Sequence, residues 1–351
     1  MTDSLLPVGL HFGLPEDLYH ADPGLGSTSL KAIASNPIDF QWSRLFDEDK
    51  DTPSKLLGSA LHCRVLDGLD VFEEAYAVPP GQDEFDELLV TKDDLINRCK
   101  ALDIDVLSKD TKATLRKKLK FANDRIPVWD EIMERFNEAY ADSQQITHKM
   151  WKTVETAAYW MQEHEKLGPV MRNGSFAHGA PEVSYIYQWE DVRLKIRLDY
   201  VYHNLIVDLK TYAPWSSEPI HKQIIKTVMN WRYDLQAAAY LRGLNDAYDQ
   251  YHGGTLQVHG DEPYKGFVDK LFSTTDFNWY WVMVRSQGAP APTVVELDHQ
   301  SFVLGSARDS IEQAIQTYRY YRDQFGDDKP WSAPSDIITL TDEDFPAYFG
   351  L

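Results

Sequence analysis

Three closely spaced β-like segments in the middle of the chain constrain its fold most. They run from Val183 to Trp189, from Val192 to Tyr202 and from Leu205 to Leu209, and all are rich in β-branched and aromatic side chains. Only two polar residues separate each segment from the next. Connections this short join antiparallel strands, whereas parallel strands need a long crossover. The sequence therefore predicts three consecutive antiparallel strands.

Helical patterns surround these strands. Apolar residues at helical spacing predict a short helix over Ser29 to Ala34 and a second from about Ser54 to Asp67. Longer helical stretches are expected at 127–167, 219–251 and 302–325, and a further strand pair near 279–284 and 294–297. This order of elements predicts an α/β (α+β) fold.

Composition limits the class of protein. The chain has 351 residues, of which 43% are hydrophobic, so it is long enough for one large or two ordinary globular domains. Its 55 acidic and 35 basic residues give a net charge of −20, which disfavours a general polyanion binder unless a metal or a local basic lining reverses the sign at the contact. Two cysteines exclude a disulfide framework and a four-cysteine metal centre. We expect a cytoplasmic protein, because neither a signal peptide nor a membrane-spanning run is apparent.

One segment reverses the charge balance. Between Thr91 and Leu119 eight Lys or Arg residues stand against five Asp residues, in two expected helices around a turn at Ser108 to Thr111. This basic segment suggests a small helical insert over 86–122, between residues 1–85 and 123–351 of the main fold.

The strands carry acidic and basic side chains in a pattern that suits metal-dependent chemistry. Asp199 alternates with apolar residues on its strand, and Asp208 and Lys210, two apart on the next strand, share one face. If these strands pair, two carboxylates and a backbone carbonyl, that of Leu209, form an oxygen site for Mg²⁺. Glu182 supplies a third carboxylate. An amine beside a metal suits phosphodiester hydrolysis, in which Lys210 orients water or stabilises developing charge.

Context gives this motif its weight. An acid-x-Lys triplet occurs four times in the chain, but only the triplet at Asp208 ends an apolar strand that follows another Asp-bearing strand. A solvated cross-strand ion pair is the competing interpretation. Arg232, Gln236 and Tyr240 are spaced to share a helix face downstream. His62 lies on a mainly apolar helix, where a partly buried structural histidine is the alternative to a catalytic one.

The order His62, Glu182, Asp199, Asp208-x-Lys210, Gln236-x-x-x-Tyr240 resembles the PD-(D/E)xK nuclease superfamily. The segments Gly26-Ser27-Thr28-Ser29-Leu30, Ala34 to Pro37 and Leu57 to His62 are similar to the start of RecE-type (exonuclease VIII-like) catalytic domains. The similarity covers about residues 8–80 and 125–245. One departure is Leu198, where the superfamily name has Pro before the Asp.

The resemblance implies a central mixed sheet flanked by helices, and a Mg²⁺ site, with Mn²⁺ as the alternative metal. The implied metal ligands are Glu182, Asp199 and Asp208, with His62 as a further one, and Lys210 is the implied catalytic lysine. The implied DNA contacts come from Gln236 and Tyr240. We also expect DNA contacts from Arg232, spaced to share their helix face, and from Arg197 and Lys195 on the polar face of the Asp199 strand. The implied function is an exonuclease that degrades linear double-stranded DNA from 5′ ends in phage-type recombination, in bacteria or phage-infected cells. A ring-shaped homo-oligomer such as a tetramer and a single-strand annealing recombinase are the implied partners.

The basic insert resembles a SAP or HeH-type helix-extended-helix module, which implies that Lys112, Lys117 and Lys118 contact DNA phosphates. A solvated helical hairpin is the alternative. For the whole chain, the alternatives are another endonuclease of the superfamily, a Cas4-like nuclease, which two cysteines disfavour, or a catalytically idle DNA-binding scaffold. The sequence has no G-x-x-x-x-G-K-[ST] and no H-E-x-x-H motif, so nucleotide hydrolysis and zinc hydrolysis are disfavoured.

Overall fold

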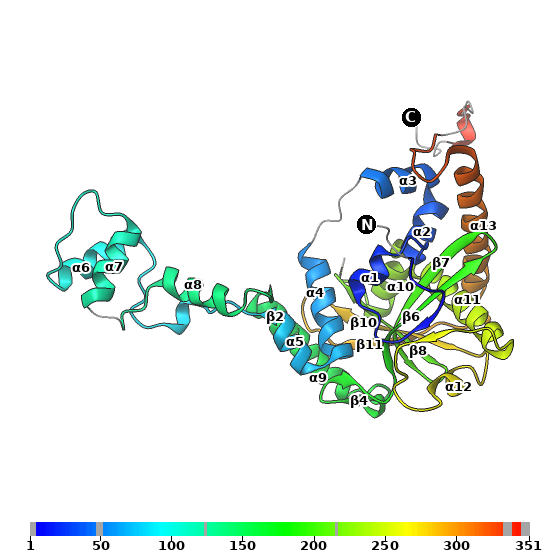
Figure 1. Ribbon diagram of the computed structural model, residues 1–351, viewed down its shortest axis with the longest axis horizontal. Coiled ribbons are helices and arrows are strands. Elements are labelled where there is room, and N and C mark those ends of the chain that lie inside the picture. The colour runs from blue at the N-terminus through cyan, green and yellow to red at the C-terminus, as the bar shows by residue number, and fades with distance from the viewer. Residues whose placement is uncertain (1–4, 47–51, 123–124, 215–216, 333–338, 345–351) are drawn as a thin grey trace.

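The computed structural model describes residues 5–46, 52–122, 125–214, 217–332 and 339–344. Within these residues a seven-stranded mixed sheet forms the centre of the fold, in the order β11-β10-β8-β7-β6-β1-β9 (Figure 1). Its strands are β1 (Gly9–His11), β6 (Ala180–Trp189), β7 (Val192–Tyr202), β8 (Leu205–Tyr212), β9 (Val258–His259), β10 (Asn278–Arg285) and β11 (Pro292–Glu296). The predicted mixed sheet is therefore confirmed.

The three consecutive strands predicted from the sequence are β6, β7 and β8, and they pair antiparallel. Glu190 and His203, in the two-residue turns between them, have positive φ angles of 50° and 54°. This backbone conformation gives tight hairpins whose twist matches that of the strands. β8 continues to Tyr212, beyond the predicted end at Leu209, so Lys210 lies within the strand.

The remaining strands make the sheet mixed. β10 pairs parallel to β8, as expected for two strands joined through a helical crossover. β11 pairs antiparallel to β10. On the other side β1 lies between β6, to which it is antiparallel, and β9, to which it is parallel. The N-terminal segment is thus built into the sheet.

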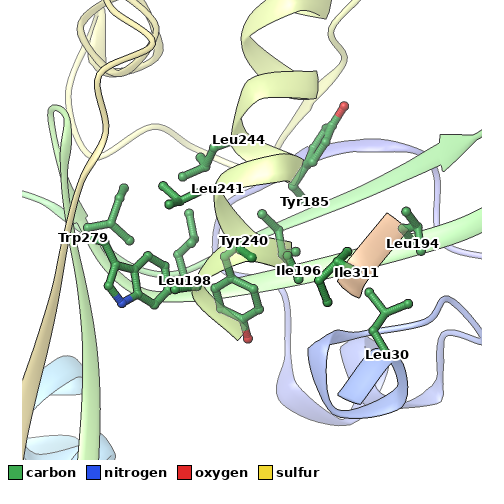
Figure 2. Close-up of a cluster of buried hydrophobic side chains, with 14 of the residues drawn as sticks. Leu30, Tyr185, Leu194, Ile196, Leu198, Tyr240, Leu241, Leu244, Trp279 and Ile311 are labelled. Carbon is green, nitrogen blue, oxygen red and sulfur yellow. The ribbon is translucent and has the colours of Figure 1, made fainter. Parts of the chain in front are cut away.

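Helices cover both faces of the sheet. The helices of the main body are α1 (Glu16–Ala21), α2 (Ser27–Ser35), α3 (Pro37–Phe46), α4 (Pro53–His62), α5 (Leu69–Ala75), α9 (His148–Gln162), α10 (Ile220–Trp231), α11 (Tyr233–His252), α12 (Phe267–Leu271) and α13 (Phe302–Phe325). On one face α2, α11 and α13 enclose a core that includes Leu194, Ile196 and Leu198 of β7 (Figure 2). On the other face α4 and α9 cover Val207 and Leu209 of β8.

Two of the predicted long helices are broken. The stretch 127–167 contains α8 (Trp129–Ala139) and α9, separated by the short strand β3 (Gln144–Gln145), which pairs with β2 (Tyr76–Ala77). The stretch 219–251 divides into α10 and α11 at Arg232, whose φ of 49° is left-handed. Helical spacing predicts that a stretch is helical. It does not predict the residues at which the helix is interrupted.

The basic insert forms an arm that extends away from the sheet (Figure 1). Its helices α6 (Lys92–Ala101) and α7 (Lys112–Ala122) match the prediction, and with neighbouring loops they enclose a separate core. That core also contains Ile126 and Val128, and Leu89 bridges to Val128. The packed unit therefore extends beyond the predicted boundary at residue 122, and α8 continues it.

Candidate active site

Three of the predicted metal ligands converge at one point. The ligand atoms of His62, Glu182 and Asp199 all lie within 4.8 Å of one another. They come from separate elements, since His62 ends α4 whereas Glu182 and Asp199 lie on β6 and β7. Residues distant in the sequence are thus brought together by the packing of α4 against the sheet.

Glu182 has an unusual backbone for a strand residue. Its φ is 51°, a left-handed conformation that costs roughly 1–3 kcal/mol for a residue other than glycine and is concentrated at functional sites. The β6–β7 register pairs Pro181 with Tyr200 and Val183 with Leu198, which sets Glu182 opposite Asp199. The residue pairs on either side belong to the β-ladder, but Glu182 and Asp199 do not pair in it. The ladder is therefore interrupted where the two carboxylates meet.

In β6 and β7, the alternation of side chains between the two faces of the sheet also shifts by one residue near Glu182 and Asp199. Ala180 and Val183 belong to the same core although they are three residues apart, and so do Leu198 and Val201. Side chains three apart in a regular strand point to opposite faces. The strict alternation predicted for β7 therefore holds from Leu194 to Leu198 and shifts at Asp199.

The pairing of β7 with β8 ends at the same point. The last paired residues are Tyr200 and Val207, and beyond them Asp199 Oδ2 accepts the backbone N–H of Leu209 at 2.7 Å. A carboxylate thus replaces the strand partner that Leu209 would otherwise have. The carboxylate is held in place at the point where the strands separate.

The donor set fits a divalent cation. His62 Nε2 lies 3.0 Å from the carbonyl oxygen of Leu209 and 3.8 Å from Asp199 Oδ2. When Nε2 carries a proton it donates to the carbonyl oxygen of Leu209, and a cation in the place of that proton would have nitrogen, carboxylate and carbonyl ligands nearby. Burial raises the pKa of Glu182 to about 7, and Asp199 adds to the rise. Two close carboxylates of this kind favour a cation between them.

Asp208 and Lys210 form a separate pair beside this cluster. Lys210 Nζ lies 2.6 Å from Asp208 Oδ2, and Gln236 Nε2 donates to Asp208 Oδ1 at 2.9 Å. Burial opposes the charge on Lys210, but Asp208 and Asp199 outweigh it and raise the pKa of the lysine. Lys210 therefore stays protonated at neutral pH. Asp208 is not part of the three-residue cluster; its two oxygens contact Lys210 and Gln236, and its role as a metal ligand stays a prediction.

A cleft of about 910 Å³ opens in front of His62 and Glu182. Glu16, Asp67 and Asp261 also border it. An acidic cleft of this kind would repel a polyanion in the absence of cations. The charge of the cleft and the ligand cluster therefore point to the same requirement for a metal.

Two basic residues predicted to contact DNA are buried and bind other groups of the protein. Lys195 is buried, and its Nζ donates to the carbonyl oxygens of Tyr19 and Asp22 at 2.7 and 2.6 Å. Arg197 is also buried, with Nη1 3.2 Å from Glu182 Oε2. Alternation predicted that both side chains lie on the polar face of the strand, and in the structure the ring of Tyr19 in α1 lies against both of them. Lys195 thus holds the backbone of residues 19–22, and Arg197 borders the cleft while it pairs with Glu182.

The helix after the sheet also differs in part from the prediction. Gln236 contacts Asp208, as described above. Tyr240 is buried and packs edge-on against Trp279, with ring centroids 5.7 Å apart (Figure 2). Arg232 does not share their helix face, because it forms the left-handed junction before α11 and pairs with Asp234 at 3.0 Å. DNA contacts by Gln236 and Tyr240 stay predictions.

Acidic residues of α8 neutralise much of the basic arm. Lys112 lies 2.7 Å from Asp130, and Arg116 lies 2.6 Å from Glu134. Lys118 is paired within the insert, with Asp110 at 2.6 Å. Among the described residues Lys117 has no ion-pair partner, and it is exposed. Of the three lysines in the insert that are predicted to contact DNA, Lys117 is therefore the one whose charge is not paired within this part of the structure.

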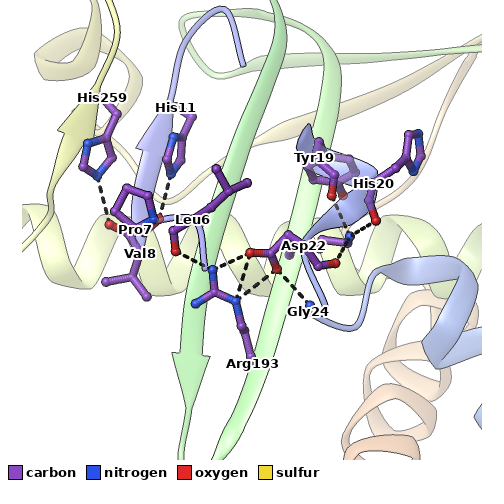
Figure 3. Close-up of polar contacts among 11 residues, drawn as sticks. Leu6, Pro7, Val8, His11, Tyr19, His20, Asp22, Gly24, Arg193 and His259 are labelled. Carbon is purple, nitrogen blue, oxygen red and sulfur yellow. Dashed lines mark hydrogen bonds and ion pairs between the residues drawn. The ribbon is translucent and has the colours of Figure 1, made fainter. Parts of the chain in front are cut away.

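A polar network that the sequence did not predict anchors the N-terminal segment (Figure 3). Arg193 Nη2 lies 2.5 Å from Asp22 and 2.6 Å from the carbonyl oxygen of Leu6. The rings of His11 and His259 stack with centroids 4.5 Å apart. These contacts hold the segment that forms one wall of the cleft. No local sequence signal links residues so distant in the chain.

Comparison with known proteins places these features in context. The family described as "PDDEXK-like domain of unknown function (DUF3799)" matches residues 41–258. A crystal structure of a Eubacterium rectale protein described as "Putative exonuclease" is similar with a TM-score of 0.48 and 14% identity, over 91% of this chain and 89% of that one. No curated protein matches the chain. In the described part of the chain, no helix combines the length and the apolar character needed to cross a membrane.

Proposed function

Because the chain belongs to the PDDEXK-like family DUF3799, we propose that it is a metal-dependent nuclease that cleaves DNA at the His62, Glu182, Asp199 and Asp208–Lys210 site. Membership confirms the resemblance to the PD-(D/E)xK superfamily. The observation that carries the proposal is the convergence of His62, Glu182 and Asp199 within 4.8 Å, next to a lysine held protonated by Asp208.

The residues that would hold the metal are Glu182, Asp199 and His62, with the carbonyl oxygen of Leu209. Mg²⁺ is the expected ion and Mn²⁺ the alternative, since carboxylate and carbonyl oxygens suit both. When bound, such an ion lowers the pKa of a coordinated water and offsets phosphate charge. The four protein groups lie on four different elements, α4, β6, β7 and β8, so the fold itself sets their separation.

The lysine supplies positive charge rather than a base. Lys210 Nζ is held by Asp208, and the raised pKa of the lysine keeps the ammonium charged. A fixed ammonium stabilises the negative charge that develops on phosphate oxygens in the transition state, and it can donate a hydrogen bond to the attacking water. Gln236 fixes the other oxygen of Asp208, which positions the pair.

The proposed substrate is linear double-stranded DNA, digested from 5′ ends to leave 3′ single strands for an annealing recombinase. The resemblance of residues 8–80 and 125–245 to RecE-type exonucleases supports this substrate and a ring-shaped oligomer. A ring would let an acidic exterior coexist with a positively charged channel. A cytoplasmic location is part of the same proposal.

The test is digestion of 5′-labelled linear duplex beside covalently closed circular duplex, in Mg²⁺ or EDTA, by the wild type and by Asp208→Asn. Loss of the linear substrate alone, only with metal and only with the wild type, would support an exonuclease at this site. Cutting of the circle would indicate an endonuclease instead. Equal digestion by Asp208→Asn would refute the assigned site, and no digestion of either substrate would favour the idle scaffold.

A further inference from the structure

A second lysine lies beside the Asp208–Lys210 pair. Lys31, on α2, has its Nζ 5.7 Å from the ring centroid of Tyr233, and Lys210 Nζ lies 5.4 Å from the same centroid. Tyr233 is the first residue of α11, one turn before Gln236. Packing of α2 against α11 therefore brings two ammonium groups to one aromatic ring at the candidate site.

The charge of Lys31 is incompletely compensated. Its Nζ donates to the carbonyl oxygen of Trp231 at 3.3 Å, which leaves two of the three ammonium donors for other partners. In the part of the chain that the structure describes, no carboxylate forms an ion pair with Lys31. Burial lowers the pKa of Lys31 and Lys210 lowers it further, whereas Asp208 and Asp234 oppose the change. A partly buried ammonium in this state gains free energy from an anionic ligand.

We propose that Lys31 binds a backbone phosphate of the substrate strand, adjacent to the phosphate that is cleaved at Asp208 and Lys210. The inference rests on the proposed nuclease function and adds a substrate-binding residue to it. Phosphates follow one another along a strand at regular intervals, so a cation next to the cleavage site meets a neighbouring phosphate. The ring of Tyr233 holds both lysine side chains in place through cation–π contacts.

The two lysines have different tasks. Lys210 is bound to Asp208 at 2.6 Å and acts at the reacting phosphate. Lys31 lacks such a carboxylate and binds a phosphate that does not react. An interaction of this kind is equally strong before and during the reaction, so its loss raises KM and changes kcat little.

The experiment compares Lys31→Met, Lys31→Arg and the wild type, with Lys166→Met as a matched control at an exposed lysine beyond α9. Affinity for a fluorescent linear duplex is measured in Ca²⁺ between about 50 and 200 mM salt. Cleavage kinetics are measured in Mg²⁺, and thermal unfolding checks that each variant is folded. We expect Lys31→Met to bind about tenfold more weakly, with a salt slope smaller by about 0.9. KM should rise at nearly constant kcat, and Lys31→Arg should restore binding.

Several results would overturn the inference. One is a Lys31→Met protein with wild-type affinity and salt slope. Another is a loss confined to kcat, and a third is an equal loss in Lys166→Met. If the wild type neither binds nor cleaves duplex, the proposed function fails, and the inference fails with it. If the wild type cleaves and Lys31→Met is indistinguishable from it, the inference alone fails.

Discussion

Glu182 faces Asp199 across β6 and β7 at a position where the β-ladder is interrupted and Glu182 has a left-handed backbone. The carboxylates are thereby brought together at a cost in backbone strain and in charge repulsion. Strain of this kind persists where the surrounding structure enforces it. The pair therefore stores an unfavourable free energy that a bound cation would relieve.

This relationship predicts a pH-dependent stability difference between the metal-free wild type and Glu182→Gln. The pKa of Glu182 is raised to about 7 from an ordinary value of 4.5, so the folded state favours the protonated form. That contribution to stability is complete below the ordinary pKa and is lost as pH rises through about 7. Glu182→Gln should therefore melt at a higher temperature than the wild type at high pH, with a smaller gap at pH below 4.5. Calorimetry in EDTA measures the gap, and an exposed Glu165→Gln serves as control.

For the Asp208–Lys210 pair, we expect one double variant to recover stability without recovering cleavage activity. Lys210→Met leaves the nearly inaccessible Asp208 without its cation and should cost about 3 kcal/mol of unfolding free energy. Asp208→Asn combined with Lys210→Met removes both charges and should recover most of that loss. Neither protein should cleave DNA. Denaturant titration and a cleavage assay measure the two effects, and a double variant as unstable as Lys210→Met would contradict the prediction.

The burial of Lys195 predicts a structural role. Lys195→Met leaves the carbonyl groups of Tyr19 and Asp22 without their donor, which should cost about 1–3 kcal/mol. The salt dependence of DNA binding should stay at the wild-type value, because no phosphate contact is lost. Urea unfolding and binding titrations check both statements. A smaller salt slope with unchanged stability would restore Lys195 as a DNA contact.

The arm provides a matched pair of lysines for a fourth prediction. Charge reversal at the exposed Lys117 should weaken DNA binding without loss of stability, if the arm contacts phosphate. Charge reversal at Lys112 should destabilise the packing of α7 on α8, since it faces Asp130 at 2.7 Å. Binding and unfolding measurements on Lys117→Glu and Lys112→Glu distinguish the two. Unchanged affinity in Lys117→Glu would remove the arm from the DNA-binding surface.

The sequence predicted the parts of the fold that depend on local pattern. Alternating strand residues and two-residue turns located β6, β7 and β8, and the placement of Asp208 and Lys210 on one face followed from a spacing of two. The shift at Asp199 could not be predicted, because it depends on the backbone of Glu182 on a neighbouring strand. Tyr233 could have been found from its position three residues before Gln236. Lys31 has no such signal, since only tertiary packing brings α2 to the site.

The same limit applies to the surroundings of the basic residues. Lys195 alternates with apolar residues, but alternation identifies a face and not what covers it. Lys112 belongs to a basic helix whose acidic partner α8 follows later in the chain. Charge counted along a segment therefore overstated the positive potential of the folded arm.

The position of β1 between β6 and β9 also limits when this part of the sheet can form during synthesis. β1 spans residues 9–11, yet one of its two neighbours is formed by residues 258–259. The wall of the cleft that starts at Phe12 continues directly from this strand. During synthesis, residues 9–11 are made before residues 258–259, and β1 acquires this second sheet neighbour only after those later residues have been made. A nascent chain therefore lacks a finished cleft until synthesis has passed residues 258–259.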